Sequence, residues 1–309
     1  MLLAARTERL RAYKRLARIL SKSNVNEGIW AYVLLIPYLV NLLLFTAGPV
    51  IAALVLSFTH YDLLRPPIPA GIENYARAFG DRDVQAAFRN TAYYVAAYVP
   101  ITMTFALFIA IALNQKIRGI VWYRAAFFIP VVTSGVATAI MWQIVLSKLG
   151  IANYLLGLVG FRPVDWWGYE RALGSIIMMG VWGGLGVLMM FWLSALQGIP
   201  VHLYEAASID GAGWWGKFRH VTLPMLTPMA LFLMILGIIG SFQVFVSTFV
   251  ITSGGPGNAT LTLALLIYQE GFTYFYMGYA SALAYMMFVI VFIVTMIQWR
   301  LQRYWVFYE

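Results

Sequence analysis

Three glycines in the stretch 205–224 are spaced as in phosphate-binding loops, so nucleotide binding is the first chemistry to consider. Gly211, Gly213 and Gly216 match the dinucleotide pattern G-x-G-x-x-G, and with the following lysine they match most of the phosphate-loop pattern G-x-x-x-x-G-K. Both patterns require a preceding strand, whereas the residues before Gly211 favour a helix. Phe218 also stands where a phosphate loop places the Ser or Thr that reaches Mg²⁺. We therefore expect no nucleotide site here.

Catalytic and metal-binding patterns find no support in the rest of the chain. The histidines are His60, His202 and His220, and none stands in a two-histidine metal spacing. There is no cysteine, and neither G-x-S-x-G nor H-E-x-x-H occurs. The sequence predicts a non-catalytic chain that binds no metal and no cofactor of its own.

The elements that position the glycine-rich stretch are two short helices between long apolar runs. Pro200 suits a first helical position, where its missing N–H is harmless, so 201–209 is expected to be a helix that Asp210-Gly211 ends. A second helix is expected over 213–221, with Trp214, Phe218 and Val221 on one face. Helices of about ten residues are marginal alone in water, so the flanking spans or a partner must brace this pair.

The composition places the chain in a lipid bilayer. Of 309 residues, 62% are hydrophobic and 11% are charged, and so few charges could not cover the surface of a soluble protein. The net charge of +9 is spread over short loops and forms no stripe with interleaved aromatics, so no nucleic-acid partner is expected.

Six apolar runs are long enough to cross the hydrocarbon core, which needs about 20 apolar residues per helix. The sequence therefore predicts an all-α polytopic membrane protein with six transmembrane helices. The predicted spans are 29–58, 92–113, 125–146, 173–196, 225–251 and 278–299. A further apolar segment, 261–268, is too short to span, so we expect it to re-enter the membrane or lie along its surface.

The positive charges give the predicted orientation. Fourteen Lys and Arg residues fall on the side that holds both termini and the segment 197–224, against seven on the other side. By the positive-inside rule, both termini and this segment are cytoplasmic. Half of the fourteen lie in residues 1–28, which are interpreted either as an amphipathic helix on the inner membrane face or as a solvated basic tail.

The predicted spans contain no ionisable Asp, Glu, Lys, Arg or His. Intramembrane charges usually mark ion pathways, proton relays or voltage sensors, so the driving energy is expected to arrive from outside the bundle, and a neutral solute is favoured. Uncharged polar and aromatic residues within spans are the candidate solute path, although for each of them a helix-to-helix contact is the alternative. The candidates are Gln243, Ser247, Trp182, Gln143 and Trp142. Glycines of the fourth span at 180, 183, 184 and 186 are interpreted as packing positions.

The cytoplasmic loop resembles the EAA signature of the membrane subunits of binding-protein-dependent ABC importers. The matching residues are Glu205, Ala206 and Ala207, then Asp210, Gly211 and Ala212, then Leu223 and Pro224. Two further segments, 241–245 and 254–260, resemble the region around the fifth span in the carbohydrate-uptake branch.

This resemblance implies a type I importer core, of the MetI-like kind, in a bacterial or archaeal cytoplasmic membrane. It implies a permease domain over 29–309 that follows the tail 1–28, with a coupling loop at 198–224. The implied partners are a second permease, two ATPase subunits that bind ATP and Mg²⁺, and an extracytoplasmic solute-binding protein. Glu205 would contact the ATPase or brace the loop, Ala206 and Ala207 would permit close approach, and Gly211 would supply the turn.

Two other function classes remain open from the residues alone. One is a self-contained secondary transporter or channel, which would move its solute without ATP. The other is a membrane-embedded enzyme, which would need a catalytic pair that solvent can reach.

Overall fold

A computed structural model describes residues 30–115 and 118–307, and it divides the chain into two compact units, 1–55 and 56–309. The described part of the first unit belongs to an apolar helix that extends from Trp30 to Ser57. This helix includes the π-helical segment η1 (Leu42–Ala47) and α2 (Gly48–Ser57). It confirms the first predicted span, whereas the predicted basic tail 1–28 lies outside the described residues.

Long helices of the second unit confirm three more predicted spans. They are α4 (Arg82–Leu113), α8 (Ala172–Gly198) and α15 (Met277–Leu301). The helix α4 begins well before the predicted 92, because Asp81 caps it by accepting a hydrogen bond from the backbone N–H of Asp83 at 2.9 Å. Its first turns are polar, and they extend the helix beyond its apolar stretch.

The third predicted span is not one straight helix. The structure forms α5 (Ile120–Val132) and α6 (Gly135–Val145), which meet at an angle of 101°. Thr133 and Ser134 between them are extended, with ψ near 137° and 134°. Pro130 weakens the end of α5 because it lacks an N–H and crowds the preceding turn. The described residues thus provide five long membrane-spanning helices, and six if this bent pair is one span.

The fifth predicted span is also interrupted. It consists of α12 (Thr227–Phe242) and α13 (Val246–Thr252), and 243–245 between them are not helical. Hydrophobicity alone did not reveal this break, because the apolar run continues through it.

Short elements connect the spans. They are β1 (Thr59–His60), β2 (Ile68–Pro69), α3 (Glu73–Gly80), α7 (Ile151–Leu158), α9 (Val201–Ile209), α10 (Trp214–Lys217), η2 (Phe218–Thr222), α11 (Leu223–Met225), α14 (Leu263–Tyr268), η3 (Gln269–Thr273) and η4 (Gln302–Tyr304). Leu263, Leu265 and Leu266 are buried in a core cluster with α4 and α15, so segment 261–268 does not lie along a surface, and its expected re-entry into the membrane stays a prediction.

Glycines of α8 allow α4 and α5 to approach closely. A Cβ at Gly180 or Gly184 would lie 2.5 Å from the hydroxyl of Tyr94 or Tyr98, and one at Gly186 would clash with the Phe127 carbonyl. These three glycines confirm the packing interpretation.

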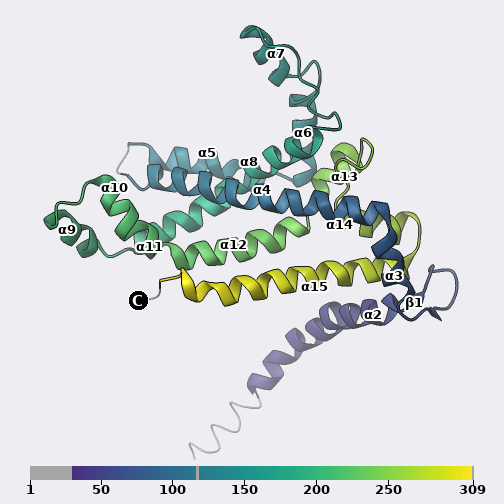
Figure 1. Cartoon of the computed structure of the whole chain (residues 1–309). Helices are drawn as coiled ribbons and strands as arrows, with labels where there is room; N and C mark the ends of the chain where they lie inside the picture. The colour runs from purple at the N-terminus through teal and green to yellow at the C-terminus, as the bar shows by residue number, and fades with distance from the viewer. Residues whose placement is uncertain (1–29, 116–117, 308–309) are drawn as a thin grey trace, which may run out of the picture. The chain divides into compact units, whose positions relative to one another are not determined.

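The short elements of the second unit gather at two opposite ends of its long helices. Figure 1 shows α9, α10, α11 and the end of α15 at one end of the long helices, with α3 and α14 at the other. The predicted coupling loop therefore lies at the same end as the last described residues of the chain.

Candidate functional site

The helix α9 is held against the bundle through one face. Leu203 and Tyr204 pack on the core cluster formed by α4, α8 and α12. The Tyr204 hydroxyl lies 3.0 Å from the hydroxyl of Thr222, which is itself buried. The predicted helix 201–209 is confirmed as α9, although Pro200 is its extended N-cap and not its first helical residue.

The end of α9 explains why the signature has a glycine at position 211. Gly211 has a φ of +79°, a left-handed conformation that costs other residues about 1–2 kcal/mol. Its N–H donates to the Ser208 carbonyl at 3.1 Å, and the N–H of Ala212 donates to the Ala207 carbonyl at 2.8 Å. These paired bonds form a Schellman motif, with Asp210 as the C-cap. Gly211 thus supplies the predicted turn, and Ala207 and Ala212 contribute backbone groups to this helix end.

The opposite face of α9 is exposed. Glu205, Ala206 and Asp210 are all exposed, and Ile209 exposes 87% of its surface. Among the described residues, the Glu205 carboxylate makes no hydrogen bond and no ion pair, so no contact within this chain supports a role in bracing the loop. This face presents a carboxylate and an apolar side chain to a partner.

The second short helix extends further than expected. Instead of 213–221, helical residues continue from Trp214 through η2 and α11 to Met225. The rings of Trp214 and Phe218 stack at 5.7 Å with an interplanar angle of 3°, which confirms that they share a face. Leu223 and Pro224 lie in α11, where the Pro224 carbonyl accepts a hydrogen bond from Thr227 at 2.6 Å.

The five candidate path residues do not form one site. Trp142 and Trp182 meet edge to face at 5.9 Å and line an apolar groove between α4 and α8. Gln143 donates to the Ile251 carbonyl at 3.3 Å, so its amide joins α6 to α13. Gln243 and Ser247 lie together in a different cavity. The five candidates thus fall into two pairs, Trp142 with Trp182 and Gln243 with Ser247, and a separate Gln143.

That cavity has a volume of about 330 Å³ and lies where both interrupted spans meet α8. Its lining includes residues from both breaks and from α8, namely Pro130, Thr133, Gly135, Thr138, Met179, Gly180, Gly183, Gln243, Val244, Phe245, Val246 and Ser247. A Cβ at Gly183 would meet no atom within 4 Å, so this glycine faces the cavity and its interpretation as a packing position is wrong.

The cavity is uncharged and mostly apolar, and its polar side chains are Thr133, Thr138, Gln243 and Ser247. Gln243 is exposed, and its side chain makes no hydrogen bond among the described residues, whereas Ser247 is buried. An amide and several hydroxyls can both donate and accept hydrogen bonds, as a hydroxylated neutral solute requires. Sequence reasoning missed Thr133, Thr138 and Gly183, although the run Pro130 to Gly135 contained the helix-breaking signal.

Metal chemistry has no site in the described residues. No three His, Asp or Glu side chains in 30–115 and 118–307 lie close enough together to hold a metal ion. The arrangement instead combines an uncharged cavity at interrupted helices with a small-residue helix end at one end of the bundle.

Comparison with known families matches residues 109–304 to the family described as binding-protein-dependent transport system inner membrane component. The chain belongs to this family. It is therefore a multi-pass inner-membrane permease of an ABC importer, and not a self-contained secondary transporter or channel.

Individual relatives agree with this permease assignment over most of the chain. The probable ABC transporter permease protein YesP of Bacillus subtilis is 39% identical over 94% of this chain and 95% of its own length. The arabinooligosaccharides transport system permease protein AraP of the same organism is 31% identical, covering 87% of each.

A solved structure shows the same fold. The bacterial alginate ABC transporter, in complex with an alginate pentasaccharide-bound periplasmic protein, matches with a TM-score of 0.79 at 20% identity. The alignment covers 91% of this permease and 96% of that chain. The importer permease fold predicted from the sequence is thereby confirmed.

Proposed function

We propose that this permease imports a neutral carbohydrate that an extracytoplasmic solute-binding protein delivers. A second permease completes the pathway, and two ATPase subunits that bind ATP and Mg²⁺ supply the energy. The relative AraP, which is named for arabinooligosaccharide transport, supports a saccharide as solute. The observation that carries the proposal is the uncharged cavity at two interrupted spans, where an amide and three hydroxyl side chains line a mostly apolar wall.

The non-helical breaks in the third and fifth predicted spans favour a solute path at this position. Backbone N–H and C=O groups cannot be left unpaired in lipid, so such breaks are not expected to face the bilayer. Irregular backbone at membrane depth is tolerated where it is enclosed in protein or lines a cavity. In transporters, such discontinuous helices commonly form the substrate site. At the break in the fifth span, the amide of Gln243 and the hydroxyl of Ser247 would contact the solute's hydroxyl groups.

The coupling proposal concerns the loop 198–224. The exposed face of α9, with Glu205, Ala206 and Asp210, would dock on an ATPase subunit, while Leu203 and Tyr204 transmit its movement to the bundle. Gly211 and Ala212 keep the helix end compact, so that α9 moves as a rigid lever. Leu223 and Pro224 join this lever to the fifth span.

The loop is proposed to be cytoplasmic, together with both termini. The described end of the chain supports a common side for the loop and the C-terminus, because the N–H of Phe307 donates to the hydroxyl of Thr227, beside the loop, at 2.9 Å. The excess of positive charges in the segments predicted to be cytoplasmic agrees with it.

The direct test is to co-express the permease with its neighbouring transport genes, purify the complex, and screen solutes for stimulation of ATP hydrolysis. We expect stimulation by a neutral saccharide only when the binding protein is present. Transport by the purified single chain without ATP, or a complex that responds only to charged non-saccharide solutes, would contradict the proposal.

A single substitution in the cavity tests whether the solute path passes Gln243. Gln243→Leu removes the amide from the cavity and should raise the solute concentration for half-maximal uptake by about tenfold, as expected for one or two lost hydrogen bonds. Gln197→Leu, at an exposed position near the end of α8, is the matched control. An unchanged solute dependence in Gln243→Leu would exclude this residue from the path.

A further inference from the structure

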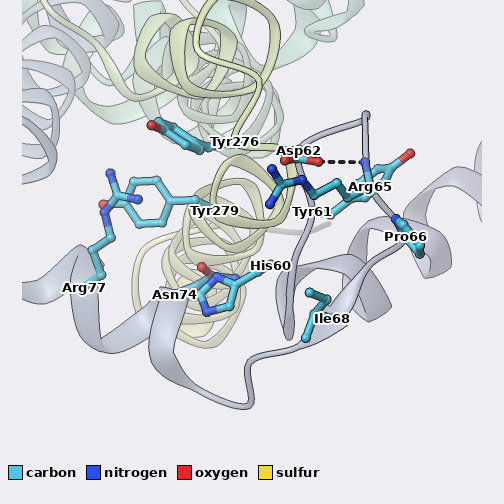
Figure 2. Close-up of a pocket in the computed structure, with 10 residues that line it drawn as sticks. All are labelled: His60, Tyr61, Asp62, Arg65, Pro66, Ile68, Asn74, Arg77, Tyr276 and Tyr279. Carbon is cyan, nitrogen blue, oxygen red and sulfur yellow. Dashed lines mark hydrogen bonds between the residues drawn. The ribbon is translucent and has the colours of Figure 1, made fainter.

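A polar pocket lies at the end of the second unit opposite the coupling loop. It has a volume of about 230 Å³ and is enclosed by the β1–β2 hairpin, α3 and the start of α15 (Figure 2). Its lining is rich in arginine and tyrosine and comprises His60, Tyr61, Asp62, Arg65, Pro66, Ile68, Asn74, Arg77, Tyr276 and Tyr279. In the proposed orientation, this pocket opens on the extracytoplasmic side.

Most charged groups at this pocket already have partners. His60 pairs with Glu73 at 3.0 Å. Asp62 accepts hydrogen bonds from the backbone N–H groups of its own turn at 3.2 and 2.9 Å. The guanidinium of Arg77 lies 3.9 Å above the ring of Tyr279 and 3.9 Å from the Glu270 carboxylate.

Arg65 differs from these groups. Its guanidinium makes no hydrogen bond or ion pair among the described residues, although the residue is exposed and close to the pocket's other polar groups. Figure 2 shows that the side chain extends from the hairpin across the pocket toward Tyr279. A planar guanidinium with free donors suits a carboxylate, which it can bind through two parallel hydrogen bonds.

The volume of the pocket favours an inserted protein side chain over an oligosaccharide as its ligand. Sites for small molecules usually have volumes of about 300–1,000 Å³, so this pocket is too small to enclose an oligosaccharide. It is large enough for one inserted side chain. Tyrosine and arginine are also the residue types that most often anchor protein interfaces.

The pocket wall is ordered before any partner arrives. The Asn74 amide donates to the carbonyls of Ser57 and Thr59, both at 2.9 Å. The N–H of Gly278 at the start of α15 donates to the Tyr61 carbonyl at 3.1 Å, and a Cβ at Gly278 would clash with the Thr59 carbonyl. A site held in this way loses little conformational entropy on binding.

We propose that this pocket is a docking site for an acidic side chain of the solute-binding protein, with Arg65 as the residue that binds its carboxylate. Tyr61 and Tyr276 flank the inserted side chain. The inference rests on the proposed function, because it assigns a contact to the binding protein that this permease requires.

The test uses the complete transporter in lipid nanodiscs with its binding protein and solute. The measured quantity is the binding-protein concentration that gives half-maximal stimulation of ATP hydrolysis. We expect Arg65→Glu to raise this concentration by at least about tenfold, because a like charge replaces an attractive one, with stimulation at saturation unchanged. Arg65→Lys keeps the positive charge, so its half-maximal binding-protein concentration should lie between those of the wild type and of Arg65→Glu.

Arg162→Glu provides the matched control. Arg162 is also an exposed arginine in a segment predicted to be extracytoplasmic, but it lies outside the pocket. An unchanged half-maximal concentration in Arg65→Glu, or an equal increase in Arg162→Glu, would overturn the proposal. Recovery of Arg65→Glu by an acidic-to-arginine change in the binding protein would support it. A wild-type complex that no binding protein stimulates would instead contradict the proposed function.

Discussion

At the scale of single residues, the signature of the coupling loop is explained by backbone geometry. The left-handed Gly211 and the hydrogen bonds to Ala207 and Ser208 end α9 within one turn. Glu205 is exposed and makes no hydrogen bond or ion pair with any residue that the structure describes. We therefore separate residues that shape the lever from those that are available to a partner.

Gly211→Pro should abolish solute-stimulated ATP hydrolysis and leave membrane insertion intact. Proline fixes φ near −65° and removes the N–H that donates to Ser208, so the helix end cannot form. A bulky residue at Ala207 should have a similar effect. Gly213→Ala is the control, because Gly213 has a φ of −70° and no atom lies within 4 Å of an added Cβ. Unchanged stimulation in Gly211→Pro would refute the lever.

A second residue-scale feature is Glu270, which is buried at the opposite end of the bundle. Burial raises the pKa of the Glu270 carboxyl above its ordinary 4.5; nearby Arg77 opposes this shift, and Asp81 and Asp83 add to it. A raised pKa means that the folded state binds the proton of the Glu270 carboxyl more tightly than the unfolded state does. The contribution of this carboxyl to folding stability is therefore greatest at low pH. That contribution is lost as the pH rises from about 4.5 through the raised pKa.

Glu270→Gln should therefore raise the melting temperature at pH 7–8, and the gain should shrink toward pH 4.5. The amide keeps the shape of the side chain without the cost of burying a charge. Thermal unfolding of the detergent-solubilised protein over this pH range measures the effect. Glu170→Gln, at an exposed position, should show no such trend. A destabilised Glu270→Gln at neutral pH would mean that pairing with Arg77 outweighs the burial cost.

At the scale of elements, the two interrupted spans are the main departure from a simple helical bundle. Each break has local hydrogen bonds of its own. The Thr133 N–H donates to the Pro130 carbonyl at 3.3 Å, and the Val244 carbonyl accepts from Thr262 at 3.0 Å. These bonds keep the irregular backbone stable at membrane depth, where water cannot pair with it.

Gly183→Leu should reduce uptake strongly while the protein still folds. An added side chain would enter the cavity between the breaks, because no atom lies within 4 Å of a Cβ at this position. Gly174→Leu is the matched control, since Gly174 is in the same helix and is equally unobstructed but lines the groove on the other side. Uptake by the reconstituted complex is the measurement, and full activity of Gly183→Leu would place the solute path elsewhere.

At the scale of the whole molecule, the two ends of the bundle have different chemistry. The predicted coupling loop exposes small, apolar and charged residues at the end of the bundle where α15 ends (Figure 1), whereas the other end carries the arginine and tyrosine pocket. This difference between the two ends fits a protein that receives its solute at one end and its driving force at the other.

Reporter fusions should confirm the orientation. A fluorescent protein fused after Glu309 should fluoresce, and alkaline phosphatase at the same position should be inactive, because both termini are expected in the cytoplasm. Phosphatase inserted after Gly160 should be active, since this loop is expected on the opposite side. The reverse pattern would place the coupling loop outside and refute the proposed mechanism.

The sequence by itself determined the membrane class, the approximate position of each span and the helix 201–209 with its turn at Gly211, because these depend on local composition and short spacing. It could not predict the course of the third span, where Pro130 and Thr133 were hidden in an apolar run. Nor could it distinguish Gly183 from Gly184, or group Gln243 with Ser247 and apart from Gln143. Those assignments depend on which helix faces lie opposite one another, and residues distant in the sequence are brought together only by tertiary packing.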